Sequence, residues 1–354
     1  MTKNDLQQQF PSNHILTDQN GKPSVMVYVK KFFLDEVIDG ASHLPHPAFI
    51  VDGKELDGIY ISKFQNVIID GLAYSLPDRD PATRVDFDTA SNACSAKGNG
   101  FHIMTAMEWG AIALWCQKND CLPFGNNDMG KDIRETDTVA RISYYNKEQA
   151  VCRTATGTGS TRWSHNGQSD GIYDLNANVW EWVGGIRLFF GELQILPNNN
   201  GASGAFSQSA TSKDWCAIDG TNGAFLLPDG NGTTKNSIKL DSVNGCWTYI
   251  SGNLTSACNA IRFCKFADVA TDASVCEQAK EILYSLGVLP CPAYGEKEVF
   301  LYANNGARER IPFRGGRWGQ GLNSGVFKTC FDDPRTYSGD AVGFRSAYYE
   351  TESP

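Results

Sequence analysis

The chain has 354 residues, of which 41% are hydrophobic and 20% are charged, a balance typical of a globular core rather than of disorder. The net charge is -9 and the lysines and arginines are not clustered, which argues against a nucleic-acid partner. The 35 glycines indicate many turns and short elements, and the absence of a long apolar stretch argues against membrane insertion.

The first 40 residues are predicted to form an N-terminal arm followed by a strand. Residues 1–22 are polar and are expected to be extended or disordered. Pro23–Val29 alternates valine with other residues, which is the period of a strand. His46–Val51 and Gly58–Phe64 are expected to pair as strands around an Asp52-Gly53 turn, because Asp-Gly is a favoured hairpin loop.

Three helices are expected further along the chain. The first covers 86–97, with Asp88 as its N-cap, and the last covers 272–286. The clearest begins at Thr105, because Thr105 and Glu108 have the spacing of a capping box. Its buried stripe is formed by Trp109, Ile112, Ala113 and Cys116. Short strands and helices without regular β-α-β alternation favour the α+β class.

The cysteines and the N-terminus bear on the compartment. Eleven cysteines form an odd set without a CxxC pair. Met1–Gln9 is polar and lacks the apolar core of a signal peptide, which favours synthesis without Sec export, as for cytoplasmic and phage proteins. Reduced, partly buried thiols are therefore expected in preference to a disulfide framework.

Three segments contain motifs that stand out from the rest of the chain. The first is 101–109 (FHIMTAMEW) with 123–126 (PFGN), the second is 171–182 (GIYDLNANVWEW), and the third is 314–318 (RGGRW), closing at 343–345 (GFR). In the second segment, Trp180 and Trp182 are expected on opposite faces of a strand. Glu181 is interpreted as a structural carboxylate, because it has no visible partner for acid–base chemistry.

In this order, the three segments resemble the formylglycine-generating-enzyme type of C-type lectin fold. The resemblance covers about residues 41–354 and implies one lectin-like domain there, with a long loop-rich insertion at about 187–310. One position departs from the family pattern, because Ala177 stands where the family usually has glycine.

The third segment also resembles the variable region, here 314–347, of diversity-generating retroelement target proteins. In that family a reverse transcriptase copies a template repeat with errors at adenines, so chosen surface positions vary on a fixed scaffold. The resemblance implies these scaffold residues: Arg314, Gly315, Gly316, Trp318, Gly343, Phe344 and Arg345. The resemblance also implies a set of variable, ligand-binding positions: Arg317, Gly319, Leu322, Asn323, Cys330, Asp332, Asp333, Tyr337, Gly339, Asp340 and Ala341. Of these, Leu322 and Asp340 lie beside positions that match the family's variable sites.

Two residues of the segment are left out of the variable set. Randomised AAC codons give Arg, Gly, Asn, Cys, Asp, Tyr and Ala, but they cannot give Gln or Lys. Gln320, which stands at a variable position of the family, and Lys328 therefore need another origin. The remaining mixture of cations, anions, aromatics and glycine is typical of a binding surface rather than of a core strand.

The leading hypothesis is a hypervariable binding protein rather than an enzyme. Residues 184–195 are similar to a run in phage-borne retroelement targets, which favours a receptor-binding protein at a phage tail tip. The partner would be a host-cell surface receptor, protein or glycan, bound by anchors such as Tyr337 and Arg317 and strengthened by multivalency. A homo-trimer is expected only by analogy with phage tail parts. The location would be the virion tail, with the cytoplasm or the cell surface as alternatives.

Two alternatives remain open at this stage. A formylglycine-generating-type oxidase would need a cysteine pair for copper after the RGG motif, but Cys330 is the only cysteine there. His43 and His46 form the only close histidine pair, and no catalytic metal site is expected. A structural calcium site is allowed for, with these candidate ligands: Asp214, Asp219, Asp229 and Asn231. A cellular surface adhesin with the same variable domain would need an export or lipidation signal.

Overall fold

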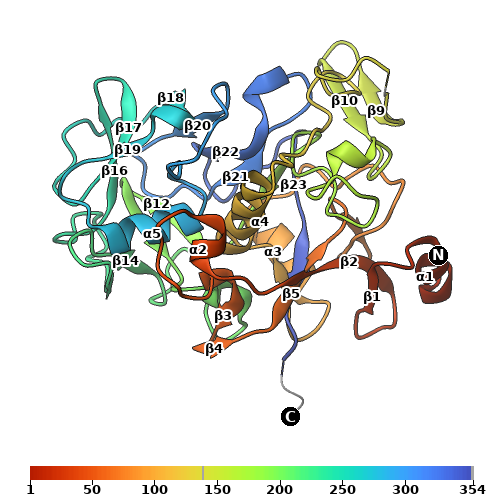
Figure 1. The fold of residues 1–354 in the computed structure, drawn as a ribbon, viewed down its shortest axis with the longest axis horizontal. Coiled ribbons are helices and arrows are strands. Elements are labelled where there is room, and N and C mark those ends of the chain that lie inside the picture. The colour runs from red at the N-terminus through yellow and green to blue at the C-terminus, as the bar shows by residue number, and fades with distance from the viewer. Residues whose placement is uncertain (138, 352–354) are drawn as a thin grey trace.

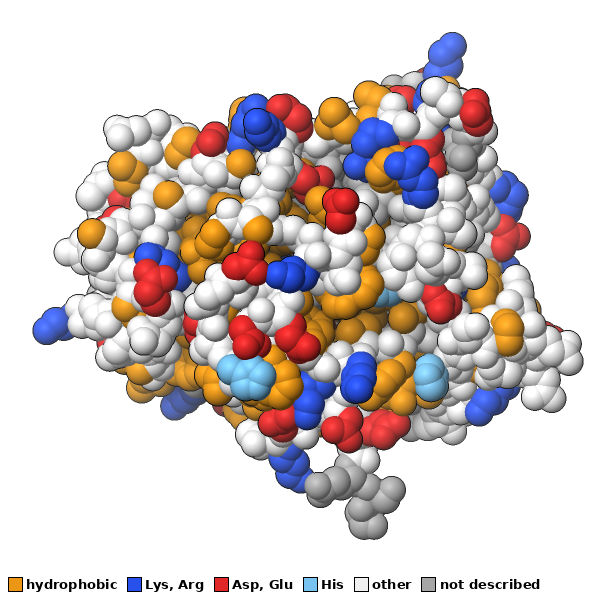
Figure 2. Space-filling view, in the orientation of Figure 1, with side chains coloured by type: hydrophobic (Ala, Val, Ile, Leu, Met, Phe, Trp, Pro, Cys, Tyr) orange, Lys and Arg blue, Asp and Glu red, His pale blue; other side chains and the backbone are white. Residues whose placement is uncertain are grey.

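The computed structural model describes residues 1–137 and 139–351 (Figure 1). Short helices lie among several separate sheets, so the α+β class is confirmed. No helix in the described residues is long and apolar enough to cross a membrane. On the face shown in Figure 2, acidic and basic side chains are interspersed. All eleven cysteines are unpaired, as expected.

The first sheet joins the N-terminus of the chain to its C-terminus. Its strands, in spatial order, are β1 (His14–Thr17), β2 (Pro23–Lys30), β5 (Gly58–Ser62), β24 (Ser346–Tyr348) and β8 (Phe101–Ile103). The strand predicted at Pro23–Val29 is thus confirmed as β2. Gly58–Ser62 pairs with β2 and β24, so its predicted pairing with 46–51 is wrong.

Two further corrections concern local structure near the N-terminus. Residues 1–22 are not an unstructured arm, because helix α1 (Lys3–Gln9) and strand β1 form there. Thr2 and Asp5 make a capping box, and Leu6 is the one buried residue of the helix, so no apolar period marks it in the sequence. The Asp52-Gly53 turn does form a hairpin, but a short one that joins β3 (Ile50–Val51) to β4 (Lys54–Glu55).

Helix α4 (Ala106–Lys118) lies at the centre of the molecule (Figure 1). The capping box between Thr105 and Glu108 and the buried stripe are confirmed. Gly110 allows α4 to meet helix α5 (Glu277–Ser285), because a Cβ there would lie 1.9 Å from the Ser285 carbonyl oxygen. Helix α3 (Phe87–Ser95) is also present, but its N-cap is Asp86 rather than Asp88. A fourth short helix is α2 (Leu34–Val37).

The second sheet brings the second and third sequence motifs together. Its strands, in spatial order, are β18 (Arg262–Lys265), β20 (Phe300–Ala303), β22 (Gly325–Phe331), β21 (Phe313–Gly315), β11 (Trp180–Trp182) and β23 (Val342–Phe344). Strand β11 pairs antiparallel with β21 and parallel with β23. The WEW, RGG and GFR motifs are therefore adjacent in space.

The predicted insertion at 187–310 is richer in structure than expected. It contains most of a third sheet, formed by β12 (Ile186–Phe189), β13 (Glu192–Ile195), β14 (Cys216–Ile218), β15 (Phe225–Leu226), β16 (Lys239–Val243), β17 (Cys246–Ile250) and β19 (Ala270–Thr271). It also contributes α5 and the strands β18 and β20 of the second sheet. These short strands were not predicted, because each has too few residues to show a regular alternation of apolar and polar side chains.

Two hairpins complete the strands. One is β6 (Val67–Ile69) with β7 (Leu72–Tyr74), and the other is β9 (Ile142–Asn146) with β10 (Val151–Thr154). In Figure 1 the β9–β10 hairpin and the β18–β20 pair lie on opposite sides of β22. They flank the region where the C-terminal segment reaches the surface.

Candidate functional site: a pocket on the C-terminal segment

The predicted scaffold residue Arg345 holds the C-terminal segment to the rest of the fold. Its guanidinium donates to both carboxylate oxygens of Glu181, with two bonds of 2.6 Å, and to the carbonyl oxygens of Ser62 and Tyr173 at 3.0 Å each. Arg345 is completely buried and Glu181 is 1% exposed. The interpretation of Glu181 as a structural carboxylate therefore agrees with its contacts.

A second buried arginine anchors the RGG motif without a carboxylate partner. Arg314 donates to the carbonyl oxygens of Leu286 and Gly287, at 3.2 and 3.0 Å, beyond the end of helix α5. Burial lowers the pKa of Arg314 to about 9. Neither carbonyl has a partner within the helix, because Leu286 is the C-cap of α5 and Gly287 follows it, and the helix dipole also favours a cation at this end.

The glycines and the tryptophan of the motif also have structural roles. Gly315 has φ of +88°, and a Cβ there would lie 2.8 Å from the Leu175 carbonyl oxygen. Trp318 is 2% exposed, and its indole N–H donates to the Ala150 carbonyl oxygen at 2.7 Å, in the turn of the β9–β10 hairpin. All seven predicted scaffold residues are buried.

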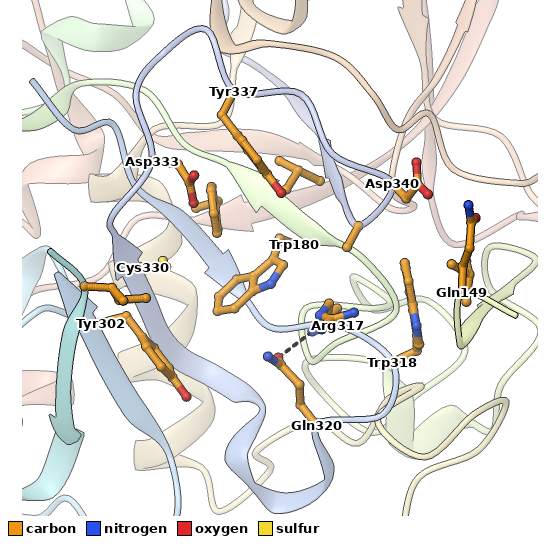
Figure 3. Close-up of a pocket in the computed structure, with 15 residues that line it drawn as sticks. Gln149, Trp180, Tyr302, Arg317, Trp318, Gln320, Cys330, Asp333, Tyr337 and Asp340 are labelled. Carbon is orange, nitrogen blue, oxygen red and sulfur yellow. Dashed lines mark hydrogen bonds between the residues drawn. The ribbon is translucent and has the colours of Figure 1, made fainter. Parts of the chain in front are cut away.

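Beside this scaffold lies a pocket of about 430 Å³ (Figure 3). Six of the eleven predicted ligand-binding residues line it: Arg317, Cys330, Asp333, Tyr337, Asp340 and Ala341. The other lining residues are Gln149, Val151, Trp180, Ile261, Tyr302, Phe313, Trp318, Gln320 and Val342. Gln320, which sequence reasoning set aside, is thus part of the wall.

The remaining predicted positions do not line this pocket. They are Gly319, Leu322, Asn323, Asp332 and Gly339. Leu322 is 46% exposed and lines a smaller pocket of about 150 Å³ with Glu296. Gly319 is exposed, whereas the other three positions are half-buried. The eleven predicted ligand-binding positions therefore form a surface around one pocket, and only some of them line the pocket itself.

Cys330 differs from the other predicted variable positions. It is 6% exposed, and its burial raises the pKa of the thiol well above its usual range. Its strand, β22, is buried along its whole length. The ten other predicted positions are exposed or half-buried. Cys330 therefore belongs to the floor of the pocket.

Aromatic side chains of two strands, β11 and β21, form the rest of the floor, and the loop residue Tyr337 packs against them from the wall. The ring centroids of Trp180 and Phe313 are 5.0 Å apart in an edge-to-face arrangement, and Tyr337 stacks on Phe313 at 6.2 Å. Trp182 also contacts Phe313, at 5.1 Å, so the expectation that Trp180 and Trp182 face opposite ways is wrong. Side chains two positions apart point to the same face of a strand.

Sequence reasoning missed the part of the wall that lies outside the C-terminal segment. Tyr302 and Ile261 come from the predicted insertion, and Gln149 and Val151 come from the β9–β10 hairpin. Nothing local in the sequence places these residues near 314–347. The one available signal was the cluster of aromatics around Trp180, for which only a place on a strand was predicted.

The pocket contains two unpaired charges of opposite sign. Within the described residues, neither the Arg317 guanidinium nor the Asp333 carboxylate forms a hydrogen bond or a salt bridge, although Arg310 attracts Asp333 from a greater distance, and Arg317 lies over the Trp318 ring at 5.6 Å. Burial, helped by the neighbouring charge of Asp332, raises the pKa of Asp333 to about 6. Asp340, by contrast, is paired with Arg84. Figure 3 shows Asp333 and Arg317 on opposite sides of Trp180.

Lys328 lies beside the pocket, although sequence reasoning set it aside. It is completely buried, and its ammonium donates to the side-chain oxygen of Asn323 at 2.8 Å. The same ammonium lies 5.3 Å from the Trp180 ring centroid and 5.1 Å from that of Tyr302. Burial lowers the pKa of Lys328 to about 7. Lys328 and Cys330 are two positions apart on β22, so both face the pocket side.

The candidate metal ligands are not assembled into a site in the described residues, which hold no group of three or more His, Cys, Asp or Glu side chains suited to a metal ion. The carboxylates of Asp214, Asp219 and Asp229 each accept hydrogen bonds from residues in their own turns, and Asn231 donates its backbone N–H to Asp229. His46 is buried with its pKa lowered to about 3 by desolvation, whereas His43 contacts Asp35.

No protein-family model and no curated protein matches this sequence significantly. Among solved structures, the chain is similar to PvdO from Pseudomonas aeruginosa, at 11% identity and a TM-score of 0.35, over 95% of this chain and 97% of that chain. It is also similar to Treponema denticola variable protein 1, at 11% identity and a TM-score of 0.32, over 96% of this chain and 99% of that chain. Because both TM-scores lie below 0.5, nothing about ligand or activity is transferred from either protein.

Proposed function

We propose that this protein is a ligand-binding protein diversified by a retroelement, with a C-type lectin fold of the formylglycine-generating-enzyme type. Its binding surface is the pocket beside 314–347 and the exposed positions around it. In the proposal, recognition is non-covalent, and the chain acts as a binder rather than as an enzyme.

The observation that carries the proposal is the separation of two residue sets within one short segment. All seven scaffold residues are buried, whereas ten of the eleven predicted variable positions are exposed or half-buried, and six of the eleven meet at one pocket. Variation at exposed positions costs little stability, and variation at buried positions costs much. A segment organised in this way can change its ligand without losing its fold.

The finer part of the proposal concerns where the protein acts. We place it at a phage tail tip, where it binds a host-cell surface receptor, protein or glycan, as a homo-trimer. Several weak sites displayed together would raise the overall affinity, so one variant need not bind tightly by itself. Tyr337 and Arg317 are the anchors in this copy, because both are exposed side chains at the pocket.

The decisive test of diversification is the DNA that flanks the gene. A near-copy of the sequence encoding Arg314–Arg345 is expected there, with mismatches confined to adenines and a reverse-transcriptase gene nearby. The mismatches should fall in the codons of the eleven predicted positions. The stretch encoding β20 serves as the control, because it should have no second copy. Absence of any repeat near the gene rejects the proposal.

Binding is tested separately with the purified full chain and cells of the host. Arg317→Ala and Tyr337→Ala should each weaken cell binding by about tenfold or more, as expected for anchor residues. Lys235→Ala, an exposed residue of the third sheet region, is the matched control and should bind as the wild type does. Equal binding by all three variants would contradict the assignment of the pocket.

A further inference from the structure

Lys328 is a buried cation with too few acceptors. An ammonium group can donate three hydrogen bonds. Within the described residues, Lys328 donates one, to the side-chain oxygen of Asn323. The Trp180 and Tyr302 rings supply only the weaker attraction of aromatic faces. The group that would satisfy this ammonium best is an anion, and none of the residues that the structure describes places a carboxylate on it.

Three other buried cations of the chain have fuller sets of partners, whereas Lys97, which lies outside this pocket, is held like Lys328 by one oxygen, that of the Ser24 hydroxyl, and by two aromatic rings. Arg345 has both oxygens of Glu181, and Arg187 pairs with Glu309 at 2.9 Å. Lys63 donates to two carbonyl oxygens, those of Ser169 and Gly171. Lys328 is therefore under-satisfied in comparison with these cations. Buried charges are costly unless paired, and such an arrangement in a binding surface suggests that a ligand completes it.

The cover over Lys328 is thin. Asn323, which contacts the ammonium, belongs to the 3-10 turn η5 (Gly321–Asn323), and that turn has no buried residue. The Asn323 amide contacts the Tyr302 hydroxyl only weakly, at 3.4 Å. Tyr302, Trp180 and Cys330 line the pocket, and the first two also contact the ammonium. The half-buried Asn323 side chain thus contacts the ammonium on one side and is partly exposed on the other.

We propose that Lys328 is a fixed anion-binding group beneath Asn323, which a ligand carboxylate reaches when the residue at position 323 is small. The proposal rests on the proposed function in one respect, namely that position 323 changes between copies of the protein. An aromatic or apolar body attached to the carboxylate would lie against Trp180 and Phe313 of the pocket floor and beside Tyr337 of its wall. Arg317, on the wall of the same pocket, adds a second positive charge.

The residue at position 323 then acts as a selector. Alanine or glycine leaves the ammonium open to a ligand. Aspartate places a carboxylate where the Asn323 amide oxygen now lies, so it pairs with Lys328 and closes the subsite. All three residues can arise from a randomised AAC codon. A single variable position can therefore switch a fixed lysine between an occupied and an anion-accepting state.

The test uses benzoate as the probe, titrated calorimetrically at pH 6 into the full-length wild type and its variants. Asn323→Ala should bind benzoate about tenfold more tightly than the wild type, in keeping with one charge-assisted hydrogen bond. Asn323→Asp should bind it no better than the wild type. The double variant Asn323→Ala/Lys328→Met should lose the whole gain. Benzamide, with the same shape and no charge, should bind all variants alike.

Three results would overturn the proposal: no gain in Asn323→Ala, a gain that survives Lys328→Met, or an equal gain for benzamide. The last would mean that the substitution only enlarges an apolar space. Thermal unfolding checks that each variant is folded, and Asn323→Ser replaces Asn323→Ala if the latter is not. The titration makes no use of the flanking DNA. A missing template repeat would therefore reject diversification and leave the anion subsite standing, and the reverse also holds.

Discussion

Glu181 and Arg345 form a buried, two-pronged ion pair, although 164 residues separate them in the sequence. The pair joins β11 to the residue that follows β23, so it connects two neighbouring strands of the second sheet. Gln65 donates to the same carboxylate at 3.0 Å. The segment that forms the site thus depends on a buried contact that does not line the pocket.

The first prediction concerns this ion pair. Glu181→Gln leaves the Arg345 charge buried with a weakened partner, so we expect a loss of about 3–5 kcal/mol in the free energy of unfolding. Urea denaturation measures the loss. Asp70→Asn, in the exposed pair with Lys22, is the control and should cost under about 1 kcal/mol. A loss from Glu181→Gln as small as that of the control would show that the pair does not hold the segment.

The second prediction concerns the pH dependence of stability. The pKa of Lys328 is lowered from 10.5 to about 7 in the folded state, so between these values the unfolded state binds more protons. Stability conferred at this position therefore rises with pH above 7, by up to about 1.4 kcal/mol per pH unit. Lys328→Met should be more stable than the wild type at pH 6, and the difference should shrink by about 2 kcal/mol between pH 7 and pH 9.

Urea denaturation of both proteins across this pH range makes the comparison. Lys63 and Lys97 also have lowered pKa values, of about 7 and about 8, but they are present in both proteins and cancel in the difference. A difference that is constant with pH would indicate that Lys328 keeps its ordinary pKa.

The third prediction concerns Gly315. Gly315→Ala combines a left-handed backbone with a Cβ placed 2.8 Å from the Leu175 carbonyl oxygen, so we expect a loss of about 2 kcal/mol or more. Gly245→Ala is a matched control, because φ there is +84° and no atom lies within 4 Å of the added Cβ. It should cost about 1 kcal/mol. Similar melting temperatures for the two variants would argue against the close approach at Leu175.

The fourth prediction separates the surface of the pocket from its floor. Tyr337 is 40% exposed, so Tyr337→Ala should lower the free energy of unfolding by about 1 kcal/mol or less. Phe313→Ala, at the ring on which Tyr337 stacks, should cost about 3–5 kcal/mol, since that side chain is 3% exposed. Denaturation curves for the two variants give both values.

Cys330 provides a further comparison within that prediction. Because it is buried in the floor, Cys330→Ala should be tolerated better than Cys330→Arg, which places an unpaired charge there. Equal tolerance of both changes would mean that the floor opens more readily than its packing suggests.

Local patterns predicted the parts of the fold that local interactions determine. The capping box at Thr105 and the alternation in Pro23–Val29 identified α4 and β2, because each signal lies within one element. The scaffold residues came from the resemblance to a known family rather than from a local pattern, and all seven are buried. Helix α1 was missed because its stability depends on a cap and a single apolar side chain.

The pocket wall could be predicted only in part, because six of its fifteen lining residues lie outside 314–347 and are brought there by long-range pairing. Tyr302 reaches the pocket since β20 pairs with β22, and Gln149 reaches it through a hairpin tied to Trp318. Neither pairing has a local sequence signal. The expectation that Trp180 and Trp182 lie on opposite faces of a strand was wrong for a simpler reason. Residues two positions apart on a strand point to the same face.

The floor beneath the C-terminal segment has a practical consequence for protein engineering. Residues 314–347 could not be moved alone onto another scaffold and keep their recognition, because Trp180 and Tyr302 would stay behind. A transplantable cassette would have to include β11, β20 and the β9–β10 hairpin as well. Only the exposed side chains at the variable positions can be exchanged freely. A synthetic library should therefore vary these positions within the whole protein rather than in a segment grafted onto another scaffold.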